Sequence, residues 1–205
     1  PEPKPMPVAA TMPEPLLPAM YRAMPNERFP LPSVNISKLR PNLWRQVVDY
    51  PTPETVGTLV VDTPAKYLYL VMENGKAMRY GIGVGRSGFS WSGRATMKYK
   101  RKWPTWTPPA EMIERQPELK PFSAANGGMQ PGLDNPLGAR ALYIFKDGRD
   151  TLYRLHGTNQ AWSIGRAVSS GCIRLINQDV IDLYGRVPDG SPIVVIPDPS
   201  TALST

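Results

Sequence analysis

The residues with the clearest chemical potential are the only histidine of the chain, His156, and its only cysteine, Cys172. A thiol with a pKa of about 8.5 is only slightly ionised at neutral pH, and a nearby imidazole can accept its proton. Gly171, directly before the cysteine, lets the backbone turn sharply and leaves amide groups free to face a developing oxyanion. These residue types indicate nucleophilic acyl transfer.

The same two residues also have a plain structural interpretation. A lone cysteine is commonly a small buried apolar residue, and a lone histidine is commonly a structural one. The flanking residues are therefore needed to distinguish the catalytic interpretation from the structural one. They read HGTN from His156 and SSGCIRL up to Leu175.

A mainly β domain is predicted to position this pair. One strand ends at His156, and Cys172 precedes a helix. Hairpin turns are predicted at Asn74-Gly75 and within 146–150. The expected strands are Thr58–Val61, Lys66–Met72, Ala77–Val84, Arg94–Lys100, Ala141–Phe145, Thr151–His156 and Pro192–Ile196.

Two helices and one long irregular segment complete the domain. Helices are predicted over Ala110–Arg115 and Asn177–Arg186, the second with Asn177 as its N-cap. The segment 102–137 is expected to form a lid or wall of a substrate groove, with a packed surface loop as the alternative.

The motifs resemble those of the L,D-transpeptidase catalytic domain, or YkuD family. The resemblance spans about 57–197 and includes the His156 and Cys172 motifs, with further similarity in Arg79–Gly85, Trp103–Pro108 and Asn135–Tyr143. It implies a β-sandwich-like fold with one or two short helices. Many members of the family have histidine where this chain has Ser170, so His156 has to supply the base.

The resemblance assigns roles at the reacting centre. Cys172 would be the nucleophile and His156 the general base and acid. The Gly157 carbonyl would orient the imidazole, and Ser170 and Gly171 would line the oxyanion hole with Cys172.

The substrate implied is a peptidoglycan stem peptide. Arg174 is expected to bind a stem carboxylate, or else to form an internal salt bridge. Asn159 and Trp162 are expected to shape the loop over the cleft. Trp106 and Tyr143 are candidates for packing against a stem, although aromatic residues in a β domain are more often part of the core.

The implied activity is peptidoglycan cross-linking through a cysteine thioester. Carbapenems are expected to acylate the same thiol. The alternatives are hydrolysis of the acyl-enzyme (an L,D-carboxypeptidase or endopeptidase), attachment of an outer-membrane protein to peptidoglycan, and a non-catalytic wall-binding module.

Outside this domain, residues 1–18 are expected to form a Pro-rich flexible arm. Residues 19–56 carry enough apolar side chains to form an extension packed on the domain, with a short helix near Pro41–Asp49. The domain itself is expected over 57–197, followed by a tail over 198–205.

Composition limits the cross-links, ligands and cellular locations that are possible for this chain. One cysteine excludes an internal disulfide, and with one histidine it cannot supply a His/Cys structural zinc site; no metal or cofactor is expected. The net charge of +7 favours anionic surroundings. The basic run 98–103 could suit nucleic acid, but we expect none to bind.

No apolar run has the length of a membrane span, and we expect an exported monomer of the periplasm or cell wall.

Overall fold

The structure, a computed structural model, describes residues 18–85, 92–169 and 171–196. The expected tail at 198–205 and nearly all of the expected arm at 1–18 lie outside the described residues, as does Ser170.

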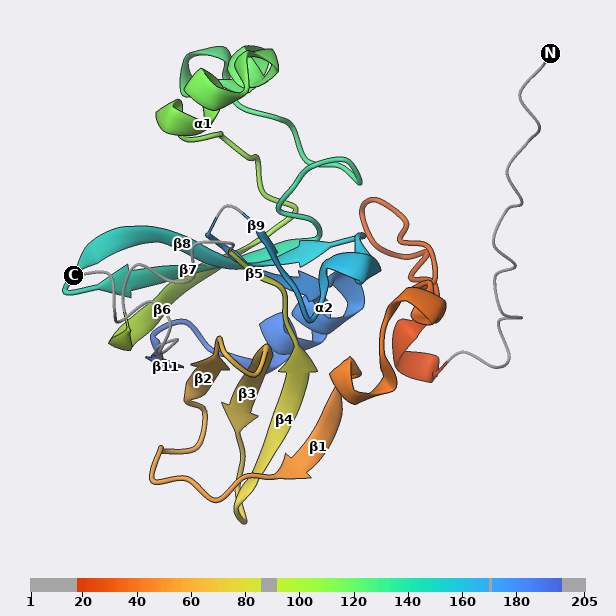
Figure 1. Ribbon diagram of the computed structural model, residues 1–205, viewed down its shortest axis with the longest axis vertical. Helices are drawn as coiled ribbons and strands as arrows, with labels where there is room; N and C mark the ends of the chain where they lie inside the picture. Colours follow the sequence, from red (N-terminus) through yellow and green to blue (C-terminus); the bar gives the residue numbers. More distant parts are fainter. Residues whose placement is uncertain (1–17, 86–91, 170, 197–205) are drawn as a thin grey trace.

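β-strands dominate the described residues (Figure 1). The main sheet has nine strands in the order β1-β4-β3-β2-β11-β6-β7-β8-β10, and β5 pairs with β9 in a second sheet. This arrangement confirms the predicted mainly β class. The strands are β1 Gln46–Asp49, β2 Leu59–Asp62, β3 Tyr67–Val71, β4 Lys76–Gly81, β5 Val84–Gly85, β6 Gly93–Lys102, β7 Arg140–Lys146, β8 Arg149–Thr158, β9 Ala167–Ser169, β10 Ile173–Ile176 and β11 Ser191–Ile196.

Within the described residues, helical structure is limited to short elements. The two α-helices, α1 Ala110–Arg115 and α2 Asn177–Arg186, have the predicted bounds. The 3-10 turns are η2 Ala19–Tyr21, η3 Ile36–Lys38, η4 Pro41–Leu43, η5 Pro117–Phe122, η6 Ala124–Asn126 and η7 Ala161–Ser163. In the part of the chain that the structure describes, no helix has the length and apolarity needed to span a membrane.

Both predicted hairpins are confirmed. β3 pairs antiparallel with β4 through Asn74-Gly75, where φ is +59° and +64°. β7 pairs antiparallel with β8 through Asp147-Gly148, where φ is +51° and +75°. Positive φ at both central residues is the conformation that Asn-Gly and Asp-Gly adopt readily in two-residue turns.

Strand β11 connects the two halves of the sheet. It pairs parallel with β2 and antiparallel with β6, so the last strand of the fold lies at its centre. In Figure 1, β1–β4 lie on one side of this junction and β6–β8 cross above them.

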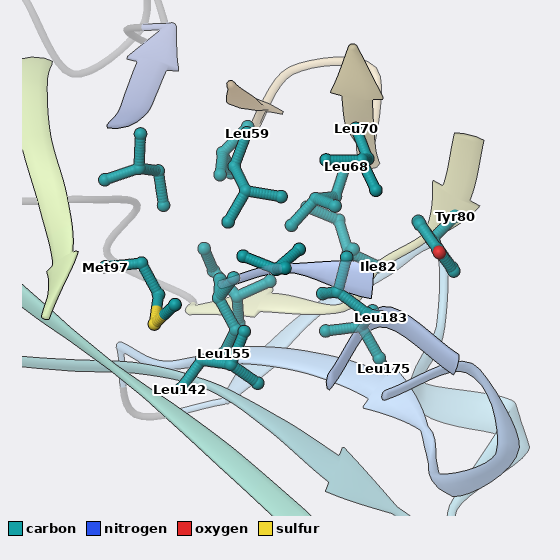
Figure 2. Close-up of a cluster of buried hydrophobic side chains, with 14 of the residues drawn as sticks. Leu59, Leu68, Leu70, Tyr80, Ile82, Met97, Leu142, Leu155, Leu175 and Leu183 are labelled. Carbon is teal, nitrogen blue, oxygen red and sulfur yellow. The ribbon is translucent and has the colours of Figure 1, made fainter. Parts of the chain in front are cut away.

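The main core lies between the two halves and α2. Figure 2 shows Leu59, Leu68 and Leu70 from β2 and β3 facing side chains from the other half. The opposing residues include Met97, Leu142, Leu155 and Leu183, all of them fully buried. Burial of these side chains holds β8 and β10 in place, and each fully buried side chain stabilises the fold by roughly 1.5–3 kcal/mol.

The N-terminal extension packs on the sheet domain, but its predicted helix is wrong beyond Leu43. Of the stretch predicted as this helix, only Pro41–Leu43 is helical, as a 3-10 turn, and Gln46–Asp49 pairs with β4 as a strand. The β-branched pair Val47-Val48 fits an edge strand better than a helix. Residues of the extension form a second apolar cluster with the η7 region and the end of β10: Tyr21, Val34, Ile36, Leu39, Leu43, Ala161, Ile164 and Ile176.

Polar contacts also link the extension to α2. The Tyr21 hydroxyl donates to Asp179 over 3.2 Å and accepts from the Arg45 amide over 2.8 Å. The Arg45 guanidinium lies 3.1 Å from Asp182 on the same helix. These groups are buried or partly buried, so the extension and α2 depend on each other for charge and hydrogen-bond partners.

The segment 102–137 forms a projecting arm that contains the predicted helix α1, and it is less irregular than predicted because it also contains the 3-10 turns η5 and η6. None of these three elements contains a buried residue. Figure 1 shows α1 held away from the sheets by two extended stretches of chain. At the base of the arm, Trp106 and Met129 exchange backbone hydrogen bonds of 3.0 and 2.7 Å.

Candidate active site

The parallel pairing of β8 with β10 aligns the two sequence motifs. Leu155 pairs with Ile173 and His156 pairs with Arg174. Leu155 and Ile173 are both fully buried. Because side chains alternate along a strand, His156 and Arg174 lie on the opposite face from that core. Cys172 directly precedes β10, and continuing the register places it beside Arg154.

The imidazole of His156 is held in one orientation. Its side chain is buried, and its Nδ1 lies 3.0 Å from the Gly157 carbonyl oxygen. A carbonyl can only accept, so Nδ1 carries the proton in this contact and Nε2 has the free lone pair. A neutral imidazole in this tautomer can act as a base through Nε2.

Burial also sets the charge of this histidine. Burial, with a smaller contribution from the nearby Arg174 charge, lowers the pKa of His156 to about 4, even though backbone contacts with Gly157 and Pro136 oppose part of the shift. Thus the imidazole is neutral at pH 7 and available as a base.

The thiol of Cys172 is protonated in the same environment. Burial raises the pKa of Cys172, and the backbone of Arg154 together with the Arg154 and Arg174 charges offsets only part of that rise. Sγ lies 3.9 Å from the Leu152 carbonyl oxygen, to which the thiol donates a weak hydrogen bond.

A neutral thiol and a neutral imidazole define what the site can do chemically. The thiol becomes a strong nucleophile only when it loses its proton. Proton transfer to the imidazole would therefore accompany attack on a carbonyl, since neither group is charged at rest.

The loop before the cysteine depends on glycine at two positions. Gly171 has φ of +134°, a conformation that L side chains rarely adopt. Gly85 of β5 packs against it: a Cβ at position 85 would lie 2.7 Å from the Gly171 Cα. Gly85 was not predicted as a site residue, although it belongs to the motif Arg79–Gly85. Ser170, the other expected oxyanion-hole residue, is outside the described residues.

Arg174 lies in the site with its guanidinium half-buried. Its Nη1 donates to the neutral side-chain oxygen of Gln160 over 3.1 Å. Burial lowers the pKa of Arg174 from its ordinary value, so the desolvated cation would gain from an anionic ligand.

Asn177 has a different part from the predicted one. Ile176 is the N-cap of α2, and no side chain caps the helix. Asn177 is buried instead: its Oδ1 accepts from the Ala139 amide over 2.9 Å, and its Nδ2 donates to Asn159 over 2.6 Å. Its N-cap pattern is a local signal, whereas these partners come from distant segments.

Asn159 and the end of the arm lie next to His156. The side chain of Asn159 donates to the Leu133 carbonyl over 3.3 Å. The Gly157 amide donates to the Leu137 carbonyl over 3.0 Å. The return of the arm thus contacts the loop that carries His156.

The three aromatic candidates lie in different places. Tyr143 stacks on Tyr99 with ring centroids 4.4 Å apart, and the Arg154 guanidinium covers its ring at 4.3 Å. Trp162 is 41% exposed in η7. Trp106 lies at the base of the arm. Only Tyr143 is connected by these contacts to the neighbourhood of Cys172, through Arg154.

Comparison with known proteins identifies the class. The L,D-transpeptidase catalytic domain model, YkuD, matches residues 57–195. The chain is 37% identical over 155 residues to a protein of Escherichia coli K12 named "Probable L,D-transpeptidase YbiS", covering 73% of this chain and 48% of that one. A Fuscovulum blasticum protein named "Putative L,D-transpeptidase in ATP synthase subunits region ORF 5" is 32% identical over 166 residues, covering 79% of this chain and 79% of that one. The chain belongs to the YkuD L,D-transpeptidase family.

One solved structure supports the fold. A Brucella melitensis protein described as "a Probable carnitine operon oxidoreductase caia" is 45% identical, with a TM-score of 0.53. The match covers 79% of this chain and 99% of that one. By contrast, the chain spans about half the length of YbiS.

Proposed function

We propose that the protein cross-links peptidoglycan by acyl transfer through Cys172. The donor is a tetrapeptide stem cleaved at its L,D peptide bond. The acceptor is the side-chain amine of diaminopimelate in a second stem.

The first step forms a thioester. Sγ attacks the carbonyl carbon of the L,D bond while Nε2 of His156 takes the thiol proton. Backbone amides at Gly171 and Cys172, with Ser170, stabilise the oxyanion; one such donor is typically worth about 10²–10³ in rate. The C–N bond then breaks, and the terminal D-alanine leaves with the proton returned by His156.

The second step releases the product. The acceptor amine attacks the thioester carbonyl, His156 takes a proton from the nitrogen, and the C–S bond breaks to regenerate the thiol. Gly157 keeps Nδ1 protonated throughout, in the way that the third member of a catalytic triad orients its histidine.

One observation carries this proposal: the parallel register that brings the histidine motif on β8 beside the cysteine motif before β10, within the segment 57–195 that matches the family. The tautomer fixed by Gly157 adds support, because it leaves Nε2 as the base.

Arg174 is proposed to bind a carboxylate of the donor stem. Its guanidinium is half-buried and hydrogen-bonded to a neutral amide, so a carboxylate would add charge pairing that Gln160 does not provide. Asn159, Trp162, Trp106 and Tyr143 are proposed to line the groove. The net charge of +7 would favour an anionic wall polymer.

The proposed setting follows from the substrate. An enzyme of peptidoglycan acts outside the cytoplasmic membrane, so we propose an exported protein of the periplasm or cell wall. Carbapenems are proposed as covalent inhibitors, because their strained carbonyl can react with the same thiol.

Incubation with purified tetrapeptide muropeptides, followed by mass analysis of the products, tests the reaction type. Cross-linked dimers and free D-alanine are expected. Monomeric tripeptides alone would indicate a hydrolase. Product formed only when an outer-membrane protein is added would indicate protein attachment, and no turnover of any kind would favour a wall-binding module.

A further inference from the structure

Strand β8 contains a bulge directly before the site. Tyr143 pairs with Arg154 and Phe145 pairs with Asp150, so one residue of β7 faces three residues of β8. Those three residues are Thr151, Leu152 and Tyr153. Bulges of this kind re-aim the chain and are common next to active sites.

Hydrogen bonds within the strand hold the bulge in shape. The hydroxyl of Thr151 donates to the Ile144 carbonyl over 2.7 Å and accepts from the Tyr153 amide over 3.2 Å. Asp150 accepts from the Leu152 amide over 2.8 Å and forms two bonds of 2.6 and 2.7 Å with Arg154. The bulge is therefore a built element of the fold.

At the tip of the bulge, Leu152 has two unfavourable features. Its φ is +62°, a left-handed conformation that is strained for a bulky side chain. Its side chain is also 71% exposed. Strained backbone that is held by its surroundings tends to occur at ligand sites.

The position of Leu152 relative to the thiol indicates which part of a substrate it could contact. Its carbonyl oxygen lies 3.9 Å from the Cys172 sulfur. Along the parallel strands, Leu152 comes before Cys172 while His156 and Arg174 come after it. A substrate anchored at Arg174 with its reacting carbonyl at the sulfur would extend toward Leu152 on the far side of the bond that breaks.

We propose that Leu152 is a specificity-determining residue that contacts the side chain of the amino acid leaving the donor. This inference rests on the proposed acyl transfer at Cys172. An exposed apolar side chain fits the small apolar methyl group of D-alanine and would favour it over glycine. The strained bulge supplies a rigid wall for that contact.

The test compares two donors, tetrapeptide stems ending in D-alanine or in glycine, by the kcat/KM for release of the terminal amino acid. The wild-type protein is expected to favour D-alanine by about 10-fold, the order of selectivity that one methyl group gives. Leu152→Asn should bring the ratio close to 1, whereas Leu152→Met should restore most of it. Asparagine tolerates left-handed backbone, so Leu152→Asn should also raise Tm by roughly 2–6 °C.

Two control variants separate this contact from general effects. Val56→Asn removes another exposed apolar side chain, 61% exposed, and Lys66→Asn changes another residue with positive φ, +63°. Both should keep the wild-type ratio. A full D-alanine preference in Leu152→Asn would overturn this inference alone, and a lowered Tm would overturn the argument from strain. A wild-type protein that releases neither amino acid would overturn the proposed function and this inference together.

Discussion

His156 and Cys172 are both neutral at rest because both are desolvated. Burial disfavours the charged form of each group, so it lowers the pKa of the imidazole and raises that of the thiol. A neutral pair avoids a buried charge until substrate binds. As a consequence, acylation should persist to a lower pH than it would with an ordinary histidine as the base.

The acid limb of kcat/KM for acylation should lie near pH 4. The base has to be neutral to accept the thiol proton, and the pKa of His156 is about 4, below its ordinary value of 6.5. Measuring acylation by a carbapenem or a stem donor from pH 3.5 to 8 checks this. A midpoint between pH 6 and 7 would show that burial does not lower the pKa of His156.

Gly85→Ala should slow acylation without unfolding the protein. The added Cβ would lie 2.7 Å from Cα and 2.8 Å from N of Gly171, so the loop that carries Cys172 would have to shift. A displacement of about 1 Å can cost on the order of 10²-fold in rate. Gly185→Ala is the control, because a Cβ there meets nothing within 4 Å. Equal acylation rates in the two variants would contradict the close packing at Gly85.

At the scale of elements, the extension and α2 share a buried carboxylate. Burial raises the pKa of Asp179 to about 7, and its neighbours Arg45, Tyr21 and Asp182 modify that shift. A carboxyl whose folded pKa is raised contributes stability that is present below about pH 4 and lost as the pH rises through about 7.

Compared with the wild type at the same pH, Asp179→Asn should therefore change the free energy of unfolding more favourably at pH 8 than at pH 4. The amide imitates the protonated acid and cannot ionise. The difference should amount to a few kcal/mol, since one pKa unit corresponds to about 1.4 kcal/mol. Urea unfolding at the two pH values measures it. A larger relative loss at pH 8 than at pH 4 would mean that Asp179 is a stabilising anion.

Local signals predicted the elements that are themselves local. Asn74-Gly75 and Asp147-Gly148 specify turns through their own backbone preferences, so both hairpins were predictable. The pairing of β11 with β2 depends on residues more than a hundred positions apart, and turn or periodicity signals carry no information about it. The helix expected to reach Asp49 failed for the same reason, because its last residues pair with β4.

The residues of the site likewise fall into those that the sequence predicts and those that it does not. Its reactive residues stood out as the only histidine and the only cysteine. The residues that position them, Gly85 and Asn177, act through contacts with distant segments. The bulge at Leu152 has turn-forming neighbours in Asp150 and Thr151, but its geometry also depends on pairing with β7, about which local signals carry no information.

At the scale of the whole molecule, the arm is a separable part. α1, η5 and η6 bury no residue, and Trp106 pairs with Met129 below them. The rest of the described fold is stabilised by three apolar clusters, none of which contains a residue of these three elements, although the third includes Trp103 at the start of the arm. The predicted lid function therefore can be tested without disturbing the core.

Replacing 110–126 with a short Gly-Ser linker should change Tm by less than about 2 °C, because exposed segments contribute little to stability. If the arm covers the thioester, the ratio of hydrolysed to cross-linked product should rise. Trp106→Ala, at the base of the arm, should shift the ratio in the same direction. An unchanged ratio in both variants would make the arm a surface feature with no part in excluding water.

Intact mass measurement shows whether Cys172 forms a thioester with the donor stem. Wild-type protein mixed with a tetrapeptide donor and quenched in acid should gain the mass of the donor minus D-alanine. Cys172→Ala should fold with an unchanged circular dichroism spectrum and gain no mass, and His156→Ala should gain it far more slowly. The same adduct on Cys172→Ala, or turnover that survives in that variant, would mean that Cys172 is not the nucleophile.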